Sequence, residues 1–265
     1  MKEKMIKIMD AFHKYNSNNM AEYAFGFDET IEYDALVVAP AFTPYKLKME
    51  EYCTVTTMRN GAYASGYLVE NKDFKIAWIK TGAAATNVLD YMSVACELKF
   101  KKAIFVAAAG GLKTNFPVGT ICTPSYMISG YINSYLNDSI KELSPFKRVE
   151  PTNEAFVDEC IKLADKSNYM LKLCSSFNVD SLALEYLHLD EIKKYGTDLV
   201  DMHSSIFYEM IDLMDIPGIA LLSVSDNLAT GDPFLGRNAE TQAEYNKGRI
   251  EILRHLIIEI TKNVK

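Results

Sequence analysis

Three short segments of this chain place small or polar residues directly after apolar runs, where chemistry could be done. They are Ala107–Leu112, Asp201–Ser205 and Ser225–Asp226. In open α/β sheets, ligands bind beyond the carboxyl ends of the strands. If the apolar runs are strands, the three segments border one binding site.

Each segment has a chemical and a structural interpretation. The small residues of 107–112 would expose backbone N–H groups to an anion or a carbonyl, or they would form a tight strand-to-helix turn. The polar side chains of 201–205 would face a ligand, or Ser204 and Ser205 would cap a helix. Asp226 follows the most apolar run, where poor solvation raises a carboxyl pKa and suits a general acid, or it caps a loop.

Hydrophobic patterns predict the elements that position these segments. We expect strands at Ala35–Pro40, 53–58, Tyr63–Glu70, Lys75–Lys80, Lys102–Ala107, Thr120–Pro124, Met170–Ser175, Ser181–Leu187, Leu199–Met202 and Ile219–Ser225. We expect helices within 2–24, Asn87–Leu98, Asn153–Lys166, Leu189–Tyr195, Ser204–Met214 and 240–262, a turn at Ala108–Leu112, a surface excursion at 130–150 and a loop at 226–238.

This alternation predicts an α/β fold. The strands are apolar throughout, which is typical of a mixed, mostly parallel central sheet flanked by helices on both faces. We expect one domain over residues 1–265, with an N-terminal helical segment at 1–30.

Composition and charge exclude several classes of protein. The net charge of −7 argues against a nucleic-acid-binding surface, and no apolar run is long enough for a membrane span. Five cysteines without regular spacing argue against a disulfide framework, and the N-terminus has no leader pattern. We therefore expect a cytoplasmic protein with no membrane partner.

Other enzyme classes lack their motifs here. Pro40-Ala-Phe-Thr-Pro-Tyr stands where a dinucleotide-binding protein would carry its glycine-rich turn. The four histidines show no metal-ligand spacing, and there is no GxSxG sequence of a serine hydrolase. We expect neither a metal nor an organic cofactor.

Three longer segments resemble the trimer- and hexamer-forming class of nucleoside phosphorylases and nucleosidases. This class includes bacterial purine nucleoside phosphorylase, uridine phosphorylase, methylthioadenosine nucleosidase and the AMP nucleosidase catalytic domain. The segments are Lys75–Val88, Ala103–Pro124 and Leu199–Asp226, within a likeness that spans roughly residues 35–262.

The resemblance implies a phosphorylase-like fold and a reaction. The enzyme would cleave the N-glycosidic bond of a purine nucleoside with inorganic phosphate, giving free base and ribose 1-phosphate. Asp226 would protonate the leaving base, and Met202 would pack under the ribose. The remaining substrate-binding residues implied by the resemblance are Asp201, His203, Ala108, Ala109, Gly110 and Ser225.

The resemblance also implies a phosphate site and an oligomer. Thr43 and Lys46 occupy the family's N-terminal phosphate loop, and Ala107 occupies its phosphate-binding turn. Arg59 would reach the phosphate of a neighbouring subunit, with His13 beside it, in a homo-oligomer built as a dimer or a trimer of dimers. Arg237 would hold phosphate or cap the last helix, and Tyr186 or Phe177 would stack on the base.

Two departures from the family pattern leave three functions open. His203 stands where the family has a ribose-binding glutamate, and Phe105 where its phosphorylases have a phosphate-binding arginine. A neutral imidazole accepts only one hydrogen bond, so sugar recognition must differ. The chain is then a phosphorylase with a rebuilt phosphate site, a nucleosidase that uses water, or a non-catalytic nucleoside-binding relative.

Overall fold

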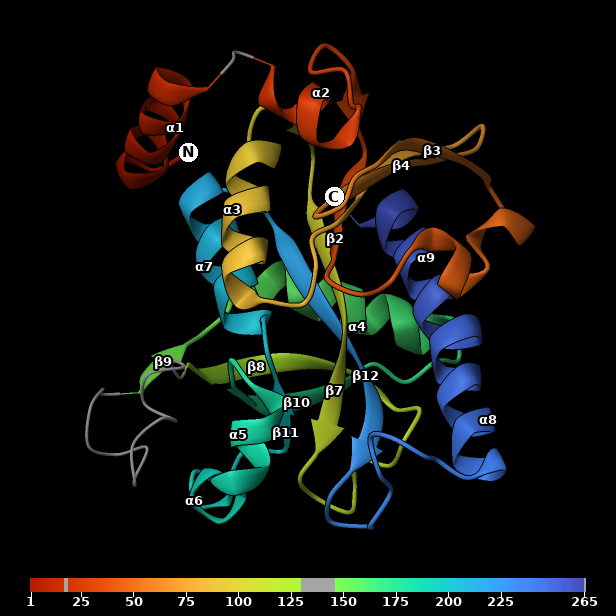
Figure 1. Ribbon diagram of the computed structural model, residues 1–265. Helices are drawn as coiled ribbons and strands as arrows, with labels where there is room; N and C mark the ends of the chain where they lie inside the picture. The colour runs from red at the N-terminus through yellow and green to blue at the C-terminus, as the bar shows by residue number, and fades with distance from the viewer. Residues whose placement is uncertain (17–18, 130–145, 265) are drawn as a thin grey trace.

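A ten-stranded mixed sheet forms the centre of the computed structural model, which describes residues 1–16, 19–129 and 146–264 (Figure 1). In spatial order its strands are β11 (Leu199–Asp201), β10 (Lys172–Asn178), β8 (Ile121–Ser129), β12 (Gly218–Asn227), β7 (Ala103–Gly111), β2 (Ala35–Ala39), β5 (Lys75–Lys80), β4 (Ser65–Glu70) and β3 (Thr54–Asn60), with β9 (Lys147–Val149) paired to β8. The neighbours β5, β2, β7 and β12 run parallel through the centre. A separate short pair joins β1 (Glu32–Tyr33) to β6 (Lys99–Phe100).

Five of these strands close into a ring. β7 pairs with β12, β12 with β8, β8 with β10 and β10 with β11, and β11 pairs back to β7 in antiparallel register. Gly110 of β7 lies opposite Val200 of β11 on one side and Asp226 of β12 on the other. The closure therefore brings the ends of β7, β11 and β12 to one place.

Helices cover both faces of the sheet (Figure 1). The first face carries α1 (Glu3–Tyr15), α2 (Met20–Phe25), α3 (Ala85–Ala95) and α7 (Ser204–Met214). The second carries the 3-10 turns η1 (Pro44–Leu47) and η2 (Met49–Glu51), α4 (Glu154–Lys166) and a C-terminal arm of α8 (Ala239–Lys247), the π-helical η4 (Gly248–Leu253) and α9 (Arg254–Asn263). Two small helices, α5 (Leu182–Leu187) and α6 (Leu189–Lys193), follow β10.

The central strands are apolar throughout because they serve two cores. In β2, Leu36 and Val38 pack into the core of the first face, whereas Val37 and Ala39 pack into the core of the second. Strands buried on both faces have no polar alternation. The predicted α/β fold with a mixed sheet flanked by helices is confirmed.

Two predicted elements are wrong. The segment Ser181–Leu187 is not a strand but contains α5, because the Ser181 hydroxyl caps the helix by accepting from the Leu184 N–H and the residues that follow favour helix. Ala108–Leu112 is not a turn, because β7 continues to Gly111. Its small residues serve close packing between strands rather than chain reversal.

Some helix and strand boundaries lie several residues from their predicted positions. β8 continues past Pro124 to Ser129, because a bulge at Ser125 takes up the interruption. Within the predicted surface excursion, residues 130–145 lie outside the described residues, and Lys147–Val149 forms β9. In the described ranges, no helix is long and apolar enough to cross a bilayer.

Candidate active site

A cavity of about 330 Å³ opens where the ends of β7, β11 and β12 meet. Ten sequence-predicted site residues line it: Lys46, Ala107, Ala108, Ala109, Gly110, Asp201, Met202, His203, Ser225 and Asp226. The structure thus brings together the three segments that the sequence singled out. Residues that the sequence did not indicate complete the lining, among them Leu182, Glu185, Phe234, Tyr245 and Arg249.

A β-bulge determines where Asp226 lies. Val224 pairs with Ala109 and Asp226 pairs with Gly110, so Ser225 is an extra residue in β12. A bulge re-aims the side chains that follow it. The Ser225 hydroxyl donates to Asp226 Oδ1 at 2.5 Å and lies 3.3 Å from the Ala109 carbonyl oxygen, which fixes the carboxyl at the cavity wall.

The environment of Asp226 suits a proton donor. Its side chain is buried, and this desolvation raises the pKa of the carboxyl above its ordinary value. The Ser225 hydrogen bond and the charge of Arg237 lower the pKa but do not cancel the effect of burial. Arg237 also donates through Nε to the Ser225 carbonyl, so it supports the strand end rather than lining the cavity.

Glu185 is a second buried carboxyl that sequence reasoning missed. It projects from α5 into the cavity wall with only 3% of its surface exposed, and its carboxyl has no hydrogen bond to the described residues. Burial, then the charges of Asp226 and Asp201, raise its pKa to about 8. The interpretation of 181–187 as a strand hid it, whereas the Ser181 cap could have indicated a helix.

Asp201 lines the cavity, but its carboxylate is engaged by the protein. Oδ1 accepts from the backbone N–H groups of His203 and Ser204 at 2.7 and 2.8 Å. Oδ2 accepts from Ser176 Oγ, Asn178 Nδ2 and Ser204 Oγ at 2.5, 2.7 and 2.7 Å. This network holds the start of α7, and with it the half-buried Met202, at the cavity.

His203 has one ring nitrogen bonded and one without a partner. Nε2 lies 2.6 Å from the Ala83 carbonyl oxygen, which can only accept, so Nε2 carries the proton. Nδ1 is buried and has no partner among the described residues. Burial lowers the pKa of His203, which favours the neutral ring with Nδ1 as an acceptor.

The predicted phosphate-binding residues divide into two groups. Lys46 and Ala107 line the cavity, and Lys46 Nζ donates to the Ala41 carbonyl at 3.0 Å. Thr43 instead caps η1 by accepting from the Lys46 N–H, and it does not line the cavity. Arg59 lies on β3 with its guanidinium 4.8 Å from the centre of the Tyr23 ring, and it does not line the cavity.

The aromatic and N-terminal candidates lie elsewhere. Phe177 packs in a small core against Phe146 and Tyr195, and Tyr186 is 44% exposed; neither lines the cavity. The His13 ring Nε2 is 2.8 Å from Glu97 Oε1. The aromatic residues that do line the cavity are Phe42, Phe234 and Tyr245.

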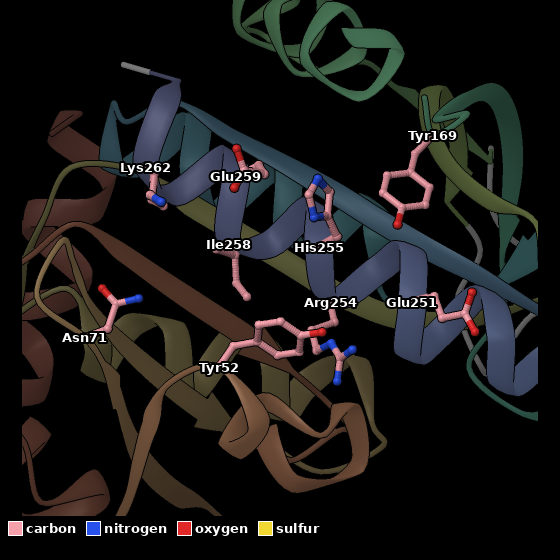
Figure 2. Close-up of a pocket in the computed structure, with 9 residues that line it drawn as sticks. All are labelled: Tyr52, Asn71, Tyr169, Glu251, Arg254, His255, Ile258, Glu259 and Lys262. Atoms are coloured by element: carbon pink, nitrogen blue, oxygen red, sulfur yellow. The ribbon is translucent and has the colours of Figure 1, made fainter. Parts of the chain in front are cut away.

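A second and larger cavity, of about 430 Å³, lies along α9 (Figure 2). Figure 2 shows Tyr52 and Asn71 on one side of α9 and Tyr169 on the other. Two cations that line this second cavity have acidic partners. Arg254 bonds to Glu51 at 2.7 Å and stacks on Tyr52, and Lys262 pairs with Asp73. None of the sequence-predicted site residues lines it, so the first cavity is the candidate active site.

The chain matches the family model of the phosphorylase superfamily over residues 43–258. No curated protein sequence matches the chain.

Three solved structures share the fold. The 5′-methylthioadenosine/S-adenosylhomocysteine nucleosidase of Campylobacter jejuni has a TM-score of 0.67 at 12% identity, covering 88% of this chain and 100% of its own. AMP nucleosidase of Bacteroides thetaiotaomicron has a TM-score of 0.62 at 14% identity, covering 95% of this chain and 98% of its own. Purine nucleoside phosphorylase of Toxoplasma gondii, in complex with immucillin-H, has a TM-score of 0.68 at 14% identity, covering 89% of this chain and 93% of its own.

Proposed function

Because the chain belongs to the phosphorylase superfamily, we propose that it cleaves the N-glycosidic bond of a purine nucleoside with inorganic phosphate. The products are the free base and ribose 1-phosphate. The observation that carries this proposal is the buried Asp226 carboxyl, which the bulge at Ser225 aims into a nucleoside-sized cavity.

Asp226 acts as the general acid. The glycosidic bond breaks with its electron pair moving to the base, and the Asp226 proton neutralises the charge that develops there. A phosphate oxygen forms the new bond to the sugar carbon, and Asp226 regains a proton from solvent. A raised pKa helps because the carboxyl must be protonated when the base leaves.

The sugar lies against Met202 and His203. Met202 offers an apolar surface, and the unpartnered Nδ1 of His203 accepts a hydrogen bond from one ribose hydroxyl. The donor capacity of the ring is already used by Ala83, so a single acceptor replaces the two that a glutamate would offer. Backbone along Ala107–Gly110 supports the other side of the ligand.

Hydrolysis is the second candidate reaction. Two observations favour it: a second carboxyl, Glu185, borders the same cavity, and nucleosidases are among the structures of similar fold. A pKa of about 8 makes Glu185 a poor base at neutral pH, which is why we place phosphorolysis first.

The two reactions are separated by their products. Purified protein is incubated with a panel of purine nucleosides, with and without phosphate, and the base and sugar are identified by chromatography. Phosphorolysis gives ribose 1-phosphate only when phosphate is present, whereas hydrolysis gives ribose in either case. If no nucleoside in the panel releases its base, the proposal is wrong and a non-catalytic nucleoside-binding relative is favoured.

We also propose that the active protein is a homo-oligomer in which Arg59 serves a neighbouring subunit. Arg59 is exposed on the edge strand β3, next to the exposed side chains of Met58 and Tyr23. Such a surface suits burial against a second copy. Light scattering of wild type and an Arg59→Glu variant tests this, since the variant should dissociate.

A further inference from the structure

Glu185 places a buried carboxyl in the wall of the candidate active site, and the protein offers it no partner. Only 3% of the residue is exposed, and no hydrogen bond or ion pair joins its side chain to the described residues. Neither of its oxygens is fully enclosed, so the carboxyl opens into the cavity that it lines. A buried carboxyl without a partner is unfavourable unless a ligand supplies one.

The helix α5 aims this side chain. Leu182 and Glu185 lie one turn apart on α5, and both line the cavity. Tyr186 and Leu187, on the remaining surface of the helix, are exposed. Ser181 fixes the start of the helix, since its carbonyl accepts from the Glu185 N–H at 2.9 Å. The direction of Glu185 therefore follows from the helix and its cap.

Glu185 lies toward the end of the cavity where the proposed acid stands. The charge of Asp226 raises the pKa of Glu185 more than the charge of Asp201 does, which indicates that Asp226 is nearer. In a purine, the 6-substituent lies between N7 and N1. A base that takes a proton from Asp226 at N7 thus turns its 6-substituent and N1 toward the same wall.

Glu185 changes its charge between pH 6.5 and pH 8.5. Burial and the two neighbouring carboxylates act in the same direction and raise its pKa to about 8. The other titratable or charged side chains that line the cavity are Lys46 on η1, His203 before α7, Tyr245 on α8 and Arg249 on η4. Burial lowers the pKa of His203 and raises the pKa of Tyr245, so both rings stay neutral over this range.

A carboxyl recognises different purine edges in its two protonation states. The neutral group donates through its O–H and accepts through its carbonyl oxygen, whereas the ionised group only accepts. Adenine offers the acceptor N1 beside one amino donor, so it pairs with the neutral group alone. Guanine offers O6 and two adjacent donors, N1–H and the 2-amino group, so it pairs with either state. A site built on such hydrogen bonds rejects a base whose groups do not match.

We propose that Glu185 determines which base the site accepts, through hydrogen bonds between its carboxyl and the purine edge that carries N1 and the 6-substituent. The inference deepens the proposed function and rests on it, because it requires a purine nucleoside bound with its base toward Asp226. While Glu185 is protonated, the site takes both adenine and guanine nucleosides. Once Glu185 is ionised, the site takes guanine nucleosides and excludes adenine nucleosides.

Direct binding tests this role without turnover. The ligands are the 9-deaza analogues of adenosine and guanosine, whose carbon–carbon glycosidic bond is not cleaved. Both present the same N7–H to Asp226, so the effect of that carboxyl cancels from the ratio of their dissociation constants. Between pH 6.5 and pH 8.5, calorimetry should show this ratio shift about fourfold in favour of the guanosine analogue. The protonated fraction of a group with a pKa of about 8 falls by the same factor.

Two substitutions at position 185 separate hydrogen bonding from charge. Glu185→Gln keeps a donor and an acceptor but cannot ionise, so the ratio of the two dissociation constants should not change with pH. Glu185→Leu has a similar size and no hydrogen-bonding group, so it should weaken both analogues by about tenfold at pH 6.5. Melting curves show whether each variant is folded.

The matched control is Asp190→Asn, which removes an exposed carboxylate from α6, the helix after α5, outside the cavity. It should reproduce the affinities of wild type and their change with pH. Glu185 does not read the base if folded Glu185→Leu binds both analogues as wild type does, or if wild type binds neither. The same conclusion follows if the wild-type ratio is constant with pH, or if it shifts equally in Glu185→Gln.

These results are distinguishable from failure of the proposed function. Analogue binding that depends on Glu185, with no base released from adenosine or guanosine, would keep the role of Glu185 and overturn the reaction. Base release from both nucleosides, with the same relative rates in wild type and Glu185→Leu, would keep the reaction and overturn the role of Glu185.

Discussion

The Asp226 carboxyl lies against the backbone of Gly110, so closely that a Cβ on Gly110 would stand 3.0 Å from Asp226 Oδ2. The same Cβ would stand 3.1 Å from Val200 Cγ1 on the opposite strand. A side chain at position 110 would thus crowd the strands on both sides, and Asp226 and Val200 would each have to shift. The space beside Gly110 is bounded by Asp226, the proposed acid on β12, and by Val200 on β11.

Gly110→Ala should therefore damage both stability and activity. We expect a loss of about 1–3 kcal/mol in the free energy of unfolding, as for overpacking of a filled site. Urea denaturation measures it, in wild-type and Asp226→Ala backgrounds. The substitution should cost less where Asp226 is truncated. Equal costs in both backgrounds would mean that Asp226 is not what the added methyl group meets.

Asp226→Asn should remove the proton donor while keeping the size of the side chain. We expect kcat/KM for a purine nucleoside to fall by about 10²–10⁴-fold, the usual contribution of general acid catalysis. The loss should be much smaller for a 7-methylpurine nucleoside, because its base is already cationic and needs no proton. Equal losses for both substrates in steady-state assays would argue against the acid role.

Glu185 should make stability depend on pH. Its ordinary pKa of 4.5 is raised to about 8 in the folded protein, so between these values the folded state binds more protons than the unfolded state. Wild-type stability should then fall as pH rises through this window relative to that of Glu185→Gln, which retains only the pH dependence of the other groups. Melting temperatures of both proteins from pH 5 to 8.5 provide the measurement. Parallel curves would show that Glu185 does not titrate as described.

His203→Phe should keep an aromatic ring near Phe105 but lose the acceptor at Nδ1, together with the hydrogen bond from Nε2 to the Ala83 carbonyl. We expect the KM of a ribonucleoside to rise by about tenfold, the worth of one hydrogen bond in a desolvated site. The 2′-deoxy and 3′-deoxy analogues identify the hydroxyl, because the one that lacks the bonded group should show no rise. A rise shared by all three would place His203 away from the sugar hydroxyls.

The main effect of Asp201→Asn should be on the stability of the folded protein rather than on ligand binding. Five donors converge on the carboxylate, and an amide would turn its own N–H₂ toward some of them. We expect a loss of about 1–3 kcal/mol in the free energy of unfolding. Ser205→Ala is the comparison, because the Ser205 hydroxyl takes no part in the network. A variant as stable as wild type would mean that the network is not needed.

Most elements, and the segments that border the site, could be predicted from the sequence, because apolar runs and the residues that follow them are local features. Ala107–Gly110, Met202 and Asp226 were found in this way. The ring closure between β11 and β7 could not be, since it depends on pairing between Val200 and Gly110 across the chain. Close contacts, rather than a turn, explain the two glycines. A Cβ on Gly110 would meet Asp226 and Val200, and a Cβ on Gly111 would meet Asn227 and Phe116.

Two cavity residues show why the remainder was missed. Glu185 lay in a segment whose Leu-Ala-Leu-Glu-Tyr-Leu pattern fits a short strand as well as a helix, and only the Ser181 cap separates the two. Arg249 lay within a continuous helical pattern, where an arginine is ordinarily exposed. Its direction is set by the π-helical turn and by the contact of Gly248 with Gly119, neither of which a periodicity reveals.

The way in which the cavity is assembled has a consequence for biosynthesis. Its wall takes residues from Pro40 to Arg249, so nearly the whole chain contributes to a space of small volume. During translation, α1, α2 and α3 of the first face can form early, but the pairing of β12 and the arrival of η4 must wait until those later segments have left the ribosome. Nascent chains and C-terminal truncations should therefore be unable to recognise ligand, however well their N-terminal part is folded.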